Sequence, residues 1–241
     1  MIELSDFYPS PAELISNEVS VLDYLRSNPY IKEKHPQVAR DAHSYYERNR
    51  IGNSSFTFNT HFDVVHSAGS RKTGSVANTR LTVSAGVWAN KAQFTNITYC
   101  LSVCRVRKDR VTILRKFHFD IAAGAPGRSQ PHPRCHLQYC GTMLPYMSKI
   151  GCRDAQLAQM QPWLSEPRIF FWPMALALLI DLALHEFPDQ SSAKFRADSY
   201  WRQLVRNQEI LLLQPFYQKC LDVIADEDGE KHILADVFYV S

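Results

Sequence analysis

The spacing of apolar residues is helical near the start of the chain and becomes alternating after residue 54. Segment 11–26 has the helical spacing and follows a serine-proline pair, which is typical of a helix start. Its apolar positions are Leu14, Ile15, Val19, Leu22 and Leu25. A second segment, 36–49, also opens on a proline but is mostly polar, so we expect it on the surface. The pattern predicts a helical lead-in over 1–50.

Four segments between residues 55 and 120 alternate apolar and polar residues with a period of two. They cover 55–66, 79–88, 95–106 and 111–120, and the turns between them are rich in Gly and Ser or in Lys and Arg. This series is typical of strands that follow one another in an antiparallel meander. The alternation predicts a sheet with one apolar and one polar face.

Residues 134–140 continue the alternation, with Cys135, Leu137 and Tyr139 on one side. A fifth strand that pairs with 111–120 is one interpretation. A short helix between Pro133 and Gly141 is the other, because proline is favoured at the first helical position and glycine just past the end. Both alternatives stay open.

The C-terminal half has helical patterns. We expect an apolar helix over 173–187 with Asp181 inside it, a second helix from Ser191 or Ser192 to about Leu213, and a short one from Pro215. This layer would cover the apolar face of the sheet. The sequence therefore predicts a single α+β domain over 1–241. Its parts are a helical lead-in (1–50), an antiparallel sheet of about four or five strands (54–141) and a helical layer (153–225).

Composition narrows the class of protein. The chain is 45% hydrophobic and 21% charged, as in an ordinary globular protein, and its net charge of +3 is dispersed, so nucleic-acid binding has weak support. The longest apolar run, 169–184, contains Pro173 and Asp181 and is too short to span a membrane. The six cysteines form no Cys-x-x-Cys pair, and the first residues include acids and no apolar leader. We expect a cytoplasmic protein with reduced thiols and no membrane contact.

The tripeptide His-Phe-Asp occurs twice, at 61–63 and 118–120. In a strand, the His and Asp of each copy share one face and the Phe lies on the other. Imidazole and carboxylate groups can bind a divalent metal, or act as a general base with an orienting partner. Side chains two residues apart on a strand are about 7 Å apart. A functional site would therefore need groups from different strands.

A histidine-rich run, 131–138, follows the second copy. We take His118, Asp120 and His136 as the candidate catalytic residues, Arg134 and Gln138 as substrate-binding residues, and His61, Asp63 and His132 as possible metal ligands. Arg134 could hold a developing anionic charge. This set suits metal- or His-dependent hydrolysis of a phosphodiester. A solvated strand face contains the same residue types, so a structural role is the alternative.

If 132–140 were helical, His132, His136 and Cys140 would share one face, at a spacing that matches no established zinc finger. The runs 132–138 and 163–168 resemble a pattern seen in uncharacterised bacterial proteins. This resemblance covers about 117–217 and implies a bacterial cytosolic protein without bringing an activity.

A fainter likeness is to the ubiquitin-conjugating fold, in which a helix, a four-strand meander, a His-Pro flap and a cysteine precede a helix. Here His132-Pro133 and Cys140 precede Pro173. The chain lacks the Asn after that Pro and the cysteine spacing, so we predict no thioester role for Cys140.

No motif is complete enough to name a reaction. The leading expectation is a binding or assembly subunit of a larger bacterial complex, with a protein partner and no catalytic activity. The aromatic content of 12% is compatible with a protein interface. The alternative is a hydrolase that uses the His and Asp residues of the polar sheet face, with a possible divalent metal.

Overall fold

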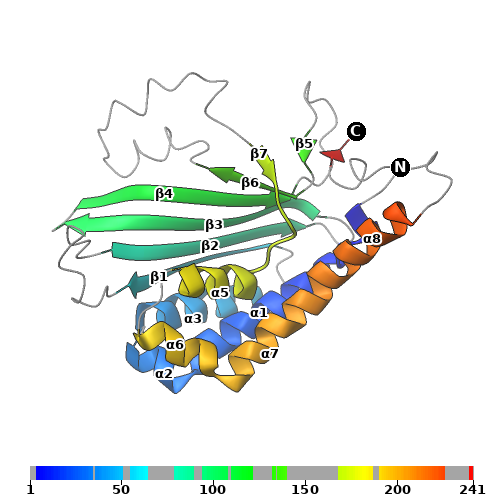
Figure 1. Cartoon of the computed structure of the whole chain (residues 1–241). Helices are drawn as coiled ribbons and strands as arrows, with labels where there is room; N and C mark the ends of the chain where they lie inside the picture. Colours follow the sequence, from blue (N-terminus) through cyan, green and yellow to red (C-terminus); the bar gives the residue numbers. More distant parts are fainter. Residues whose placement is uncertain are drawn as a thin grey trace, which may run out of the picture.

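The chain has an α+β fold, as predicted, in which one antiparallel sheet packs against helices from both ends of the sequence (Figure 1). The structure is a computed structural model. It describes residues 4–34, 36–50, 55–64, 79–89, 94–107, 110–121, 132–133, 135–139, 168–186, 190–225 and 239–240.

The N-terminal helices are η1 (Leu4–Asp6), α1 (Pro11–Ser27), α2 (Pro29–Lys34) and α3 (Pro36–Arg50). A capping box starts α1: the Glu13 amide donates to Oγ of Ser10, and the Ser10 amide donates to Oε2 of Glu13. Asn28 ends α1 and begins α2, which the sequence pattern did not predict. Its Oδ1 accepts from the amides of Tyr30 at 2.9 Å and Ile31 at 3.2 Å.

The sheet begins with the predicted four-strand meander of β1 (Ser55–Val64), β2 (Thr79–Ala89), β3 (Phe94–Arg107) and β4 (Arg110–Ile121). Two short strands, β6 (Cys135–Tyr139) and β7 (Arg168–Phe170), extend it to the order β1-β2-β3-β4-β6-β7. Because β6 pairs with β4, the strand interpretation of this segment is confirmed and the helical one is wrong. A separate pair joins β5 (His132–Pro133) to β8 (Tyr239–Val240).

The C-terminal helices are α5 (Leu176–Glu186), α6 (Gln190–Ala197), α7 (Ser199–Gln208), the π-helical turn η3 (Glu209–Leu213) and α8 (Gln214–Ile224). The helix expected from about residue 191 to 213 is interrupted at Asp198. The Asp198 carboxylate accepts from the Trp201 amide at 2.9 Å and so starts α7 as a new helix. Strand β7 lies within the range where we expected only helices.

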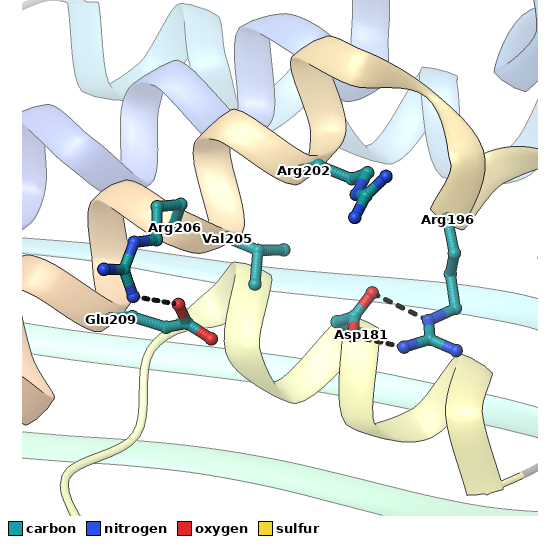
Figure 2. Close-up of a pocket in the computed structure, with 6 residues that line it drawn as sticks. All are labelled: Asp181, Arg196, Arg202, Val205, Arg206 and Glu209. Carbon is teal, nitrogen blue, oxygen red and sulfur yellow. Dashed lines mark hydrogen bonds and ion pairs between the residues drawn. The ribbon is translucent and has the colours of Figure 1, made fainter.

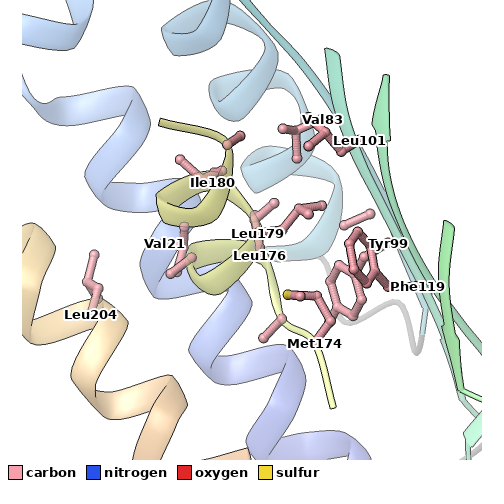
Figure 3. Close-up of a cluster of buried hydrophobic side chains, with 14 of the residues drawn as sticks. Val21, Val83, Tyr99, Leu101, Phe119, Met174, Leu176, Leu179, Ile180 and Leu204 are labelled. Atoms are coloured by element: carbon pink, nitrogen blue, oxygen red, sulfur yellow. The ribbon is translucent and has the colours of Figure 1, made fainter. Parts of the chain in front are cut away.

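The main core lies between the sheet and α5, which is itself covered by α1 and α7 (Figure 1, Figure 3). The apolar strand positions and the inner face of α5 meet in this layer. Figure 3 shows Val83, Tyr99, Leu101 and Phe119 from the strands facing Leu176, Leu179 and Ile180 of α5.

Burial of each large aliphatic side chain contributes about 1.5–3 kcal/mol. The N-terminal helices belong to this layer as well: α3 contacts β1 and buries Val38 and Ala42, although we expected it to be a surface helix. None of the helices described here is long and apolar enough to cross a membrane.

Candidate functional site

The register of the sheet brings most of the predicted site residues of β4 and β6 together. Asp120 is directly opposite His136, and His118 is opposite Gln138. Nε2 of His136 lies 3.8 Å from Oδ2 of Asp120. On the other side of β4, His118 is opposite Cys100 of β3. Two neighbouring strands thus form a polar cluster that contains all three candidate catalytic residues.

The first copy of the tripeptide is not part of this cluster. Strand β1 is separated from β4 by β2 and β3, so the two copies are about three strand spacings, or about 14 Å, apart. The row of the sheet that starts at His61 passes through Thr82 and Ser102 and reaches Lys116, not His118 or Asp120.

The other predicted ligands are also separate. His132 belongs to the small β5–β8 sheet, and Arg134 and Cys140 lie outside the described residues. Within the ranges that the structure describes, no three His, Cys, Asp or Glu side chains are placed to hold a metal ion. Asp63 is opposite Arg80 of β2, far from the cluster on β4. A divalent metal therefore stays a prediction.

The polar face is buried where β3, β4 and β6 meet. Lys116, His136 and Gln138 are all buried. Burial and, to a smaller extent, the nearby charge of Lys116 lower the pKa of His118 to about 4. The ring of His118 is therefore uncharged at neutral pH. Its Nε2 is buried and has no hydrogen-bond partner in the described part of the chain.

Cys100 and His118 are the pairing that a thiol nucleophile would need, but the electrostatics oppose that role. Burial raises the pKa of the Cys100 thiol. An activated cysteine requires a lowered pKa and a charged imidazole beside it. Since the His118 ring is uncharged at neutral pH, this pair does not form a thiolate and an imidazolium.

A buried glutamate that the sequence interpretation missed joins four elements. Oε1 of Glu18 on α1 accepts from the Tyr99 hydroxyl at 2.6 Å and from the Leu176 amide at 3.1 Å. Oε2 accepts from Nε2 of Gln208 at 3.3 Å, and Oε1 of Gln208 accepts from the Ala177 amide at 2.8 Å. The two side chains thus satisfy free amides at the start of α5.

Desolvation raises the pKa of Glu18 to about 7, although its hydrogen bonds favour the ionised form. The sequence carried a signal for this site. Glu18 falls four residues after Leu14 and four before Leu22, so it lies on the apolar side of its helix. A charged residue at such a position indicates a buried partner.

A cavity of about 380 Å³ lies beside α5, α6 and α7 (Figure 2). Asp181 of α5 accepts from Nε of Arg196 at 2.9 Å and from Nη2 at 3.0 Å, and also from Nε1 of Trp201 at 3.1 Å. Nη1 of Arg196 lies 2.9 Å from Nδ1 of His185. Because a guanidinium only donates, Nδ1 of His185 is the acceptor.

The remaining cavity residues come from α7 and η3. Nη1 of Arg206 lies 3.0 Å from Oε2 of Glu209, and Val205 contributes an apolar wall. Arg202 also lines the cavity, and its guanidinium makes no hydrogen bond or ion pair with the described residues. The cavity thus holds one arginine whose donors are available to a ligand.

Helix α8 has apolar side chains on two sides. Phe216 is buried, and its ring lies 5.7 Å from that of Phe7 and 6.0 Å from that of Phe170. Tyr217, Leu221 and Ile224 are 50%, 58% and 63% exposed. Spacings of four and three residues place these three side chains on one face, which we call the outer face of α8.

Comparison with protein-family models, curated proteins and solved structures found no match. The α+β class is therefore what the fold defines, and function has to be argued from the residues of this chain. The likenesses to uncharacterised bacterial proteins and to the ubiquitin-conjugating fold stay predictions.

Proposed function

We propose that the protein is a non-enzymatic binding or assembly subunit that associates through the outer face of α8. The observation that carries this proposal is the exposure of Tyr217, Leu221 and Ile224 on a helix whose Phe216 already anchors it to the body. A surface helix normally has charged and polar residues on its outer side. A contiguous apolar face in contact with water is typical of an interaction site.

A second copy of the same helix is the occupant that fits this face. The three apolar side chains lie within about 60° of one another around α8, and no charged residue of α8 lies between them. In an antiparallel pair related by a two-fold axis, Tyr217 of one copy would face Ile224 of the other, with Leu221 near the axis. The face is therefore complementary to itself in hydrophobicity.

The size of the contact sets its strength. An 11-residue helix is about 16 Å long, whereas a stable interface buries about 800 Å² on each partner. A contact confined to α8 would bury less surface than that on each partner. We therefore expect association that depends on concentration, with dimers forming in the micromolar to submillimolar range.

Sedimentation equilibrium over that range tests the proposal. The double variant Leu221→Asp/Ile224→Asp should remain monomeric. The matched control, Gln203→Asp/Asn207→Asp, adds the same charges to exposed positions of α7 and should dimerise like the wild type.

Two results would overturn the proposal. One is a wild-type monomer at every concentration with no co-purifying protein. The other is a dimer that the substitutions on α8 do not affect.

A second candidate function, His-dependent hydrolysis of a phosphodiester, has one observation in its favour. The buried Nε2 of His118 has no partner in the described residues and lies on the strand of the Asp120–His136 pair. Such an unsatisfied nitrogen requires an explanation, and a substrate or metal ligand is one. The low pKa of His118 counts against it as a base.

Elemental analysis of the purified protein and an assay with a chromogenic phosphodiester test this second candidate. Activity that the double variant His118→Ala/His136→Ala abolishes would support it. The absence of both stoichiometric metal and activity in the wild-type protein would eliminate it.

A further inference from the structure

We propose that the cavity beside α5, α6 and α7 binds a small phosphate-bearing compound, with Arg202 as the main anion contact. This inference is independent of the proposed association through α8. The volume of about 380 Å³ is within the range of small-molecule pockets. The charged side chains around this space come from α5, α6, α7 and η3 (Figure 2).

The three arginines of the cavity differ in how firmly other side chains hold their guanidinium groups. Arg196 is held by both oxygens of Asp181, so its position is fixed. The Arg202 guanidinium has no partner among the described residues. Arg206 pairs with Glu209, but the two side chains are 69% and 38% exposed. Such exposed pairs contribute about 1 kcal/mol or less, so Arg206 can turn to a ligand at little cost.

The geometry of α7 favours a phosphate over a single carboxylate. Arg202 and Arg206 are four residues apart, which places both side chains on the same face of α7, and both guanidinium groups can meet at one anion when Arg206 turns away from Glu209. Each guanidinium can donate two parallel hydrogen bonds to the oxygens of one anion. A phosphate monoester has enough oxygens for both arginines, whereas one carboxylate satisfies a single fork.

The balance of charge and the wall of the cavity agree with this class of ligand. Three arginines against two carboxylates leave a surplus of positive charge in the empty cavity. Val205 lies between Arg202 and Arg206 in the sequence and supplies an apolar contact. A phosphate with a small organic group would therefore use more of the site than the inorganic ion.

Isothermal titration calorimetry with inorganic phosphate, phenyl phosphate and benzoate tests the inference on the intact chain. We expect saturable binding in the order phenyl phosphate, inorganic phosphate, benzoate. Loss of one charge-assisted contact in Arg202→Gln should weaken phenyl phosphate binding about tenfold or more. Glu209→Gln, which releases Arg206, should strengthen it.

Lys194→Gln is the matched control, because it removes the same charge from an exposed position of α6 that does not line the cavity. The affinity of Lys194→Gln for phenyl phosphate should equal that of the wild type. Equal weakening by Lys194→Gln and Arg202→Gln would show diffuse attraction and overturn the inference. Benzoate binding as tight as that of phenyl phosphate, or no saturable binding of either phosphate, would overturn it too.

Discussion

The Tyr99 hydroxyl on β3 donates a 2.6 Å hydrogen bond to the Glu18 carboxyl on α1, and both residues are fully buried. The same carboxyl oxygen accepts from the amide of Leu176, the first residue of α5. One side chain therefore joins the sheet, the N-terminal helix and the start of the central helix. The partial positive charge of a helix N-terminus favours a carboxylate, but the loss of water disfavours it more.

The stability of the protein should fall as pH rises from about 4.5 to 7 because of Glu18. Its pKa is about 7 in the folded protein and 4.5 in the unfolded chain. The contribution of Glu18 to the free energy of unfolding is complete below pH 4.5. It decreases between pH 4.5 and 7, where the Glu18 carboxyl is ionised in the unfolded chain but still protonated in the folded protein, and it is lost above pH 7. The shift corresponds to about 3 kcal/mol. Urea unfolding across this range measures it.

The variant Glu18→Gln separates this effect from other titrating groups. It cannot ionise, so its unfolding free energy should lack this decrease between pH 4.5 and 7. The informative quantity is the difference between the wild-type and variant curves. If the two curves run parallel, Glu18 does not hold a proton in the folded protein.

Gln208→Ala should destabilise the fold by about 3 kcal/mol, because it leaves two buried groups without partners. Gln208 is 1% exposed, accepts from the Ala177 amide at 2.8 Å and donates to Glu18. Gln203→Ala is the matched control on the same helix, at an exposed position. Urea unfolding of both variants should show a large effect for the first and almost none for the second. Equal effects would contradict the role of Gln208.

The strands were predictable because each has one face against the helices. The alternation of Leu81, Val83 and Ala85 on β2 is a direct consequence of packing against α5, and the segment ends agree within two residues. The same period was compatible with the pairing of β4 with the strand that contains His136, but it left a helix as the alternative, which the register excludes. Strand β7 was missed because its three residues are too few to show a period.

The C-terminal helices show where a local pattern is insufficient. A serine pair at 191 and 192 suggested one continuous helix, but Asp198 ends α6 and starts α7.

Contacts between residues far apart in sequence were likewise unpredictable. Glu18 and Gln208 are separated by 190 residues, and nothing near either one indicates the other. In the candidate site, the meander order alone separates His61 from His118, because two strands lie between them.

Acid should destabilise the protein through His118. Its pKa is about 4 in the folded protein, below the ordinary 6.5, because of burial and then the charge of Lys116. The contribution of His118 to the free energy of unfolding is complete above pH 6.5. It is lost as pH falls through 4, because on acidification the imidazole becomes protonated at a higher pH in the unfolded chain than in the folded protein. The full loss is about 3 kcal/mol. NMR titration of the His118 ring measures its pKa directly, and a midpoint near 6.5 would contradict the prediction.

Two carboxylates that line the same cavity should differ greatly in their importance for stability. Asp181 accepts two hydrogen bonds from Arg196 and one from the indole of Trp201, whose side chain is fully buried. Asp181→Ala removes all three and leaves the buried indole N–H without an acceptor, which should cost about 3 kcal/mol. Glu209→Ala breaks only the exposed contact with Arg206 and should cost about 0.5 kcal/mol or less. Urea unfolding with near-ultraviolet circular dichroism measures both, since the aromatic signal reports the packing of Trp201.

Asp181→Asn refines this comparison. The asparagine oxygen can still accept from Trp201, but the amide cannot bind both nitrogens of Arg196, so its stability should lie between those of the wild type and Asp181→Ala. An asparagine variant as unstable as the alanine variant would show that the charge of Asp181, and not the indole contact, is what stabilises α7 against α5. Equal losses for Asp181→Ala and Glu209→Ala would contradict the assignment of Asp181 as the structural anchor of the cavity.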